Sequence, residues 1–206
     1  MGKGTLTRKT ILIAREFNWR ARHKKNSRAG AEDEGVVVAA KSSVLTQVVA
    51  AVEAEIANNT RETVAVFAAD GTVLVRKEGT SNRVTFTLEE KLRMRGAALY
   101  THNHPRGTSF SPRDIRNAKL LDLKEQHAVG KHYLYILRPP AEGWRMIAMT
   151  ELDTAVAATQ QQVLQEFQDQ IRRGRLSVAQ ADLNFWHTIW TRIARQFGFH
   201  YTRRTR

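Results

Sequence analysis

The spacing of the apolar residues changes near Thr150, and this change constrains the fold more than any other feature of the sequence. Before it, short apolar runs are separated by turn-forming pairs such as Asn58-Asn59 and Asp70-Gly71, which predicts strands alternating with helices. After it, apolar residues recur at helical spacing in residues 156–171 and 186–197, so no further strand is expected. The sequence therefore predicts a mixed α/β domain with a small sheet flanked by helices, followed by a C-terminal helical hairpin.

Turn and capping signals divide the first part of the chain into elements. Strands are predicted at residues 62–69, 72–76, 83–87, 97–100, 132–137 and 144–149. Helices are predicted from Ser42 or Ser43 to Asn58, from Thr87 to Gly96, and from Ser111 onward. Thr87 and Ser111 each precede an acidic residue at the third helical position, which is the pattern of a capping box.

The net charge of +13 is concentrated at the two ends of the 206-residue chain. Residues 1–28 hold nine Lys or Arg and one Glu, and residues 192–206 hold five Arg and no acid, so the segment between them is neutral. We therefore divide the chain into a basic N-terminal arm (1–41), a central domain (42–150), and a helical hairpin with a basic tail (151–206). The basic ends are either solvated tails or contacts for a polyanion such as nucleic acid or a capsid surface.

The sequence contains no cysteine, which excludes disulfides, thiolate-bound zinc, iron–sulfur clusters and cysteine nucleophiles. No apolar run approaches the ~20 residues that a membrane span needs. The basic N-terminal residues are not followed by the apolar run of a secretory signal. We therefore expect a soluble, intracellular protein with no membrane partner.

Residues 101–114, Thr-His-Asn-His-Pro-Arg-Gly-Thr-Ser-Phe-Ser-Pro-Arg-Asp, concentrate the residues that carry chemistry. His102 and His104 are two positions apart at the end of a predicted strand, so both side chains leave the same face, with Cα atoms ~6.6 Å apart. Asp114 follows at the N-terminus of a helix, which favours its ionised form. Two neutral imidazoles and one carboxylate, with a fourth position open, are typical of a catalytic zinc site. The alternative interpretation is a capping box beside a solvent-facing histidine pair.

The pattern of His102, His104, Pro105, Ser111 and Asp114 resembles the JAMM motif of the JAB/MPN metalloenzyme family, which is His-x-His-Pro followed by Ser-x-x-Asp. The full segment is especially similar to JAB-like domains in phage head-morphogenesis proteins and polymorphic toxins, and the resemblance covers about residues 62–137. It implies a curved sheet flanked by helices, one Zn²⁺, a protein or peptide substrate, and hydrolysis of peptide or isopeptide bonds. It also implies a phage or mobile-element setting, in the cytoplasm of a bacterial host or in a virion.

The resemblance also implies two catalytic residues beyond the metal ligands. A family glutamate on a neighbouring upstream strand takes a proton from the attacking water and passes it to the leaving amine, and Glu62 matches it best. Glu78, Glu89 and Glu90 are rivals, although helix capping also explains the last two. Ser111 matches the family serine that steadies the oxyanion, and it is also a helix N-cap.

Other polar residues carry weaker signals. Arg106 and Arg113 flank the motif and either attract an acidic peptide or are simply solvated. His127 and His132 fit no ligand scheme, and His187 is expected at the edge of the core. Three hypotheses remain. The first is a zinc-dependent hydrolase, the second a non-enzymatic phage structural or assembly protein that keeps the fold, and the third a basic effector associated with nucleic acid.

Overall fold

The computed structural model describes residues 33–206, with side chains from residue 44 onward. In this part of the chain, five α-helices surround a six-stranded open sheet, so the predicted mixed α/β fold is confirmed. The strands lie in the order β2-β1-β3-β4-β5-β6, and every neighbouring pair is antiparallel except β3 and β4, which are parallel. Their bounds are β1 Thr63–Phe67, β2 Val73–Glu78, β3 Leu99–Asn103, β4 Gln126–Val129, β5 Tyr133–Arg138 and β6 His200–Thr205.

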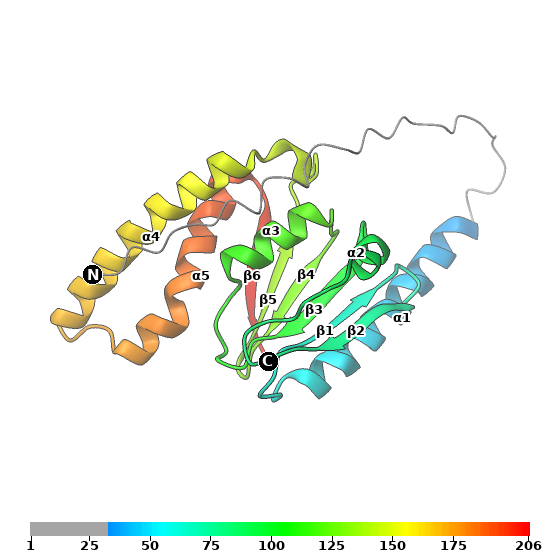
Figure 1. Ribbon diagram of the computed structural model, residues 1–206, viewed down its shortest axis with the longest axis horizontal. Helices are drawn as coiled ribbons and strands as arrows, with labels where there is room; N and C mark the ends of the chain where they lie inside the picture. The colour runs from blue at the N-terminus through cyan, green and yellow to red at the C-terminus, as the bar shows by residue number, and fades with distance from the viewer. Residues whose placement is uncertain (1–32) are drawn as a thin grey trace.

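Helices cover both faces of the sheet (Figure 1). One face is covered by α1 (Asp33–Ile56), and the other by α2 (Leu88–Met94) and α3 (Pro112–Leu120). The long helices α4 (Met149–Arg172) and α5 (Val178–Phe197) form the predicted hairpin beside the β6 end of the sheet. No helix within residues 33–206 is long and apolar enough to cross a membrane.

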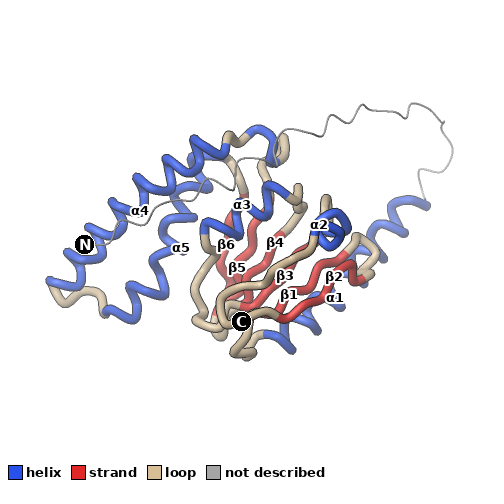
Figure 2. The backbone as a smooth tube through the Cα atoms, in the orientation of Figure 1, coloured by secondary structure: helices blue, strands red, loops and turns tan. Residues whose placement is uncertain are grey.

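Alternate residues of the central strands face opposite cores, because side chains alternate along a strand. Val64 and Val66 of β1 join the core under α3, whereas Ala65 and Phe67 join the core under α1. The strands therefore form a single layer between α1 and α3 (Figure 2). In β3 the same alternation directs both Tyr100 and His102 toward the α3 side of the sheet.

The elements with strong local signals form as predicted. β1 and β2 make an antiparallel hairpin around Asp70-Gly71, where Gly71 adopts a positive φ of 88° that suits a tight turn. Thr87 and Ser111 both close capping boxes, at the start of α2 and of α3. Gly174 lies between α4 and α5, as expected for the turn of the hairpin.

The predicted start of the first helix is wrong. α1 begins at Asp33, so Ser42 and Ser43 lie inside the helix and do not cap it. The Val and Ala residues of segment 36–40 let the helix continue toward its N-terminus, and serine costs only about 0.5 kcal/mol inside a helix. The rest of the predicted N-terminal arm, residues 1–32, lies outside the described residues.

Two predicted strands are absent from the described part of the chain. Residues 83–87 form a loop. The backbone N–H of Thr80 donates to the Arg83 carbonyl at 2.8 Å and closes a turn just before it, and Val84 and Phe86 pack against the core without joining the sheet. Residues 144–149 form a short 3₁₀ turn and the start of α4. Trp144 is buried there and donates from its indole N–H to the Leu123 carbonyl at 2.8 Å, so its apolar neighbours fill the core without joining the sheet.

Two strands were not predicted. β4 has the sequence Gln-His-Ala-Val, which lacks an apolar run, yet all four of its residues are buried between neighbouring strands. β6 comprises residues 200–205 and pairs along its whole length with β5, so the prediction that strands end near Thr150 is wrong. The predicted basic tail is therefore the end of α5 followed by an edge strand. Edge strands tolerate charged side chains because one side of the strand faces water.

Candidate metal centre

The end of β3 and the start of α3 bring three polar side chains together. His102 is the fourth residue of β3, and its ring packs beside Tyr100 and Phe110 with centroid separations of 5.4 and 6.1 Å. His104 follows the strand, and its backbone N–H donates to the Val129 carbonyl of β4 at 2.8 Å. Asp114 is the third residue of α3, where the capping box fixes its carboxylate.

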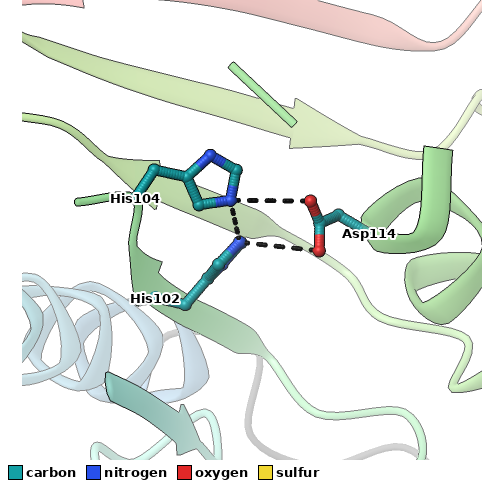
Figure 3. A group of neighbouring side chains, drawn as sticks. All are labelled: His102, His104 and Asp114. Atoms are coloured by element: carbon teal, nitrogen blue, oxygen red, sulfur yellow. Dashed lines mark hydrogen bonds and ion pairs between the residues drawn. The ribbon is translucent and has the colours of Figure 1, made fainter. Parts of the chain in front are cut away.

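The three side chains converge on one point (Figure 3). The Nε2 atoms of His102 and His104 are 2.9 Å apart, and they lie 3.7 and 3.5 Å from the nearer Asp114 oxygens. Ligands placed tetrahedrally at the usual zinc distances of about 2.0–2.1 Å are separated by roughly 3.3 Å. The donor atoms therefore fit a metal ion of this size, and His102, His104 and Asp114 form a group that could hold one.

Backbone and side-chain contacts fix the orientation of two of these ligands. The Nδ1–H of His104 donates to the Thr108 carbonyl at 2.8 Å, which leaves Nε2 free to face the ion. Asp114 Oδ2 accepts from the backbone N–H and the hydroxyl of Ser111, at 2.7 and 2.8 Å. His102 is fully buried, and its Nδ1 has no hydrogen-bond partner among the described residues.

The charges within the group stabilise one another. Burial opposes ionisation of Asp114, but the adjacent His102 and His104 outweigh burial and hold the pKa of its carboxyl well below the usual value. Burial alone would lower the pKa of His104, yet Asp114 and the Thr108 carbonyl raise it. Since a metal must replace the proton on a histidine ligand, metal affinity is expected to fall as the pH falls.

A cavity of about 170 Å³ opens beside the three ligands, and Glu62 lines it together with His104 and Asp114. Glu62 lies immediately before β1 and is thereby placed next to the end of β3. Burial raises the pKa of the Glu62 carboxyl, against the opposing influence of His102. A raised pKa suits a carboxylate that must accept a proton and later release it.

The rival carboxylates lie outside this cavity. Glu78 is half exposed and pairs with Arg61 at 2.8 Å. Glu89 lies in the first turn of α2, and Glu90 completes the capping box of α2 and pairs with Lys77 at 3.0 Å. Of the four candidate glutamates, Glu62 alone lines the cavity beside the histidines.

Ser111 lines the same cavity, and its role as the N-cap of α3 is confirmed. Its hydroxyl donates to Asp114 Oδ2 at 2.8 Å. A hydroxyl has a single proton to donate. To donate to an oxyanion, the Ser111 hydroxyl must therefore rotate away from Asp114.

The loop between β3 and α3 is held by residues that are distant in sequence. Trp190 of α5 donates from its indole N–H to the Phe110 carbonyl at 2.6 Å, and the Tyr201 hydroxyl of β6 contacts the Ser109 hydroxyl at 2.8 Å. Gly107 passes so close to Gly130 that a Cβ on Gly130 would lie 3.0 Å from the Gly107 Cα. The sequence analysis missed these supporting residues, because nothing local connects them to the motif.

The remaining histidines lie away from the ligand group. His127 is buried on the α1 face, where its ring nitrogens each lie 2.5 Å from a carboxylate oxygen, one of Glu53 and one of Glu125. His187 lies beside Tyr201, 2.8 Å from its hydroxyl, and burial lowers the pKa of His187 to about 4. His132 is exposed at the turn before β5. None of the three belongs to the metal-holding group found among the described residues.

A scan of the chain against known protein families found no match, and neither the curated proteins nor the solved structures yielded one.

Proposed function

We propose that the protein is a zinc-dependent hydrolase of peptide or isopeptide bonds, of the JAB/MPN type. The observation that carries this proposal is the convergence of His102, His104 and Asp114 beside a cavity that Glu62 also lines. A zinc ion bound by these residues lowers the pKa of a coordinated water toward about 7 and polarises a carbonyl. The ligand set leaves one position open, as catalytic zinc sites do.

Three residues of the chain supply proton transfer, orientation of a ligand and stabilisation of the oxyanion. Glu62 accepts the proton of the attacking water and delivers it to the leaving nitrogen, because its carboxyl lines the cavity beside the candidate ligands. His104 is held in the tautomer that presents Nε2, through its contact with Thr108. Ser111 orients Asp114 and, after rotation of its hydroxyl, donates to the developing oxyanion.

The experiment is elemental analysis of the purified full chain, combined with cleavage assays on a panel of peptides and isopeptide-linked peptides. We expect about one equivalent of zinc per chain. His104→Ala should lose the zinc and the activity while its circular dichroism spectrum stays close to that of the wild type, because the two cores do not depend on this side chain. His132→Ala is the matched control, since His132 is exposed and belongs neither to the ligand group nor to the cavity lining.

Full zinc content in the His104→Ala variant contradicts the metal assignment. Zinc bound by His104 together with no cleavage of any substrate favours the alternative of a non-enzymatic phage structural or assembly protein. We propose the same setting for the enzyme, namely the cytoplasm of a bacterial host or the virion of a phage. Detection of the chain in purified phage particles would place it in the virion, and its detection only in the host cell extract would place it in the cytoplasm.

A further inference from the structure

The walls of the cavity carry an excess of positive charge. Arg83, Arg106 and Arg113 line it, and Glu62 and Asp114 are the acidic residues that do so. Both carboxylates already have roles at the candidate metal centre, Asp114 as a ligand and Glu62 as the base. With a divalent cation bound, the two carboxylates no longer balance the positive charge of the arginines that line the cavity.

The three arginines differ in their partners. Arg106 pairs with Asp182 of α5 at 3.0 Å, although both side chains are more than half exposed. Arg83 and Arg113 have no ion pair within the described residues. Solvated arginines are common on protein surfaces, so charge alone would not distinguish a binding site from an ordinary rim.

The backbone gives Arg83 and Arg113 fixed places at the cavity. Arg83 lies at the end of the tight turn after β2, where a Cβ on Gly79 would meet the Arg83 carbonyl at 2.0 Å, so the turn tolerates no larger residue at Gly79. Arg113 is the second residue of α3, between Pro112 and Asp114, and the capping box fixes this end of the helix. Two separate parts of the chain therefore each contribute an exposed arginine to the lining of the cavity.

We propose that the cavity selects a substrate with an acidic side chain next to the scissile bond, whose carboxylate is bound by Arg83 and Arg113. This inference rests on the proposed peptide-bond hydrolysis and names its substrate class. A guanidinium binds a carboxylate through paired, charge-assisted hydrogen bonds. Val84, Phe86 and Tyr100 line the same cavity and suit the apolar part of an extended peptide.

The cleavage test compares two peptides that differ by one residue, Glu or Gln, next to the scissile bond. For the zinc-loaded wild type, kcat/KM should be at least about tenfold higher for the Glu peptide. A hydrogen bond to a charged group strengthens binding by roughly one to two powers of ten. Arg83→Gln combined with Arg113→Gln should remove this preference. Arg116→Gln is the matched control on α3, because Arg116 pairs with Asp153 and does not line the cavity.

A binding test separates this inference from the proposed hydrolysis. Zinc-loaded Glu62→Gln protein is titrated with each peptide by calorimetry, and the Glu peptide should bind about tenfold more tightly, with or without turnover in the wild type. Equal affinity for the two peptides overturns the selection for a carboxylate, even if both peptides are cleaved. A short oligonucleotide that binds through Arg83 and Arg113 more tightly than the Glu peptide also overturns it, and assigns the cavity to a polyanion.

Discussion

In the proposed mechanism, Glu62 transfers a proton and does not hold the metal. It lines the cavity, and burial raises the pKa of its carboxyl. Glu62→Gln should therefore keep the zinc and the fold while the rate of hydrolysis falls by roughly a hundredfold or more. Elemental analysis and a cleavage assay on the same preparation measure both effects.

Glu78→Gln is the control for Glu62, because Glu78 forms a surface pair with Arg61, and such pairs contribute about 0–1 kcal/mol. If the two variants lose the same small amount of activity, Glu62 is not the base. If Glu62→Gln loses zinc, the carboxylate acts as a ligand instead.

His127 is the centre of a second charged cluster, on the sheet face opposite the candidate metal centre. Its ring lies between Glu53 of α1 and Glu125, while Arg138 donates to Glu125 at 2.6 Å and Arg206 donates to the Glu53 carbonyl at 3.2 Å. Burial alone would lower the pKa of His127, but the two carboxylates outweigh burial and raise it. The contacts with His127 and Arg138 overcome burial and lower the pKa of Glu125 to about 2.

This cluster makes the free energy of unfolding depend on pH. A histidine whose pKa is raised by folding stabilises the protein fully below its unfolded pKa of about 6.5, and this contribution is lost as the pH rises through the folded pKa. Glu125 stabilises the folded protein above its unfolded pKa of about 4.5, and this stabilisation is lost as the pH falls toward 2. The cluster is therefore expected to stabilise the fold most between about pH 4.5 and 6.5.

Urea unfolding of the wild type and of His127→Gln at a series of pH values tests this expectation. The difference in unfolding free energy between the two proteins should be largest near pH 6 and shrink toward pH 9. Folding also raises the pKa of His104, so His104→Gln is measured as well to determine how much His104 adds to the pH dependence of the unfolding free energy. A difference that stays constant with pH would show that folding does not change the pKa of His127.

At the scale of elements, α5 and β6 both contact the loop between β3 and α3 that carries the candidate ligands. The Tyr201 hydroxyl lies 2.8 Å from both the Ser109 hydroxyl and His187 Nδ1. Tyr201→Phe removes these contacts without removing the ring, so the fold should survive while the loop becomes less well positioned. We expect zinc affinity to fall by about tenfold, at the lower end of what supporting residues contribute.

Tyr133→Phe is the control for Tyr201, because Tyr133 is an aromatic residue of the neighbouring strand whose ring stacks under Arg203. Competition with a chelator of known affinity measures zinc binding in both variants. Unchanged zinc affinity in Tyr201→Phe would mean that β6 supports the fold but not the loop.

Elements with local signals could be predicted from the sequence, and those that depend on tertiary contacts could not. The capping boxes at Thr87 and Ser111 and the turn at Asp70-Gly71 involve neighbouring residues, so their patterns are visible in the chain. β4 could not be predicted, because its residues Gln126 and His127 are polar and only contacts with other elements bury them. β6 could not be predicted, because it is an edge strand rich in arginine. Tertiary context overrides propensity at such positions.

The same distinction applies to the candidate site. The three candidate ligands, His102, His104 and Asp114, lie in one short segment, so their spacing alone identifies them. Glu62 lies outside this segment, immediately before β1, so only the family resemblance indicates it. Arg83 carries no sequence signal, because only the turn after β2 brings it to the cavity.

At the scale of the whole molecule, the two basic ends of the sequence are not equivalent. Arg203 lies over the Tyr133 ring at 4.5 Å and donates to Asn184, and Arg206 donates to the backbone carbonyls of Gly130 and Glu53. These contacts engage part of the C-terminal charge in the fold. Residues 1–28, outside the described residues, carry nine Lys or Arg with a single Glu.

We therefore expect that any binding to nucleic acid depends mainly on residues 1–28, without sequence specificity and with a steep dependence on salt. Removing these residues should weaken binding to a mixed-sequence DNA strongly, as measured by fluorescence anisotropy at several salt concentrations. Removing residues 200–206 instead should lower the melting temperature, because it removes an entire strand. Equal DNA affinity with and without residues 1–28 would place the polyanion surface on the folded part of the chain.

The pairing of β6 with β5 also has a consequence for how the chain folds. β5 and β6 are separated in sequence by the whole of α4 and α5, whereas the segment from β1 to α3 has only short connections. Contacts between distant segments form slowly, because the intervening chain loses conformational freedom before it gains any contact. The ligand residues are therefore expected to assemble before Tyr201 and Trp190 reach them. A metal ion bound during that interval also stabilises the transition state that follows, in which its ligands are already together. Refolding in the presence of zinc should therefore be faster than refolding in the presence of a chelator.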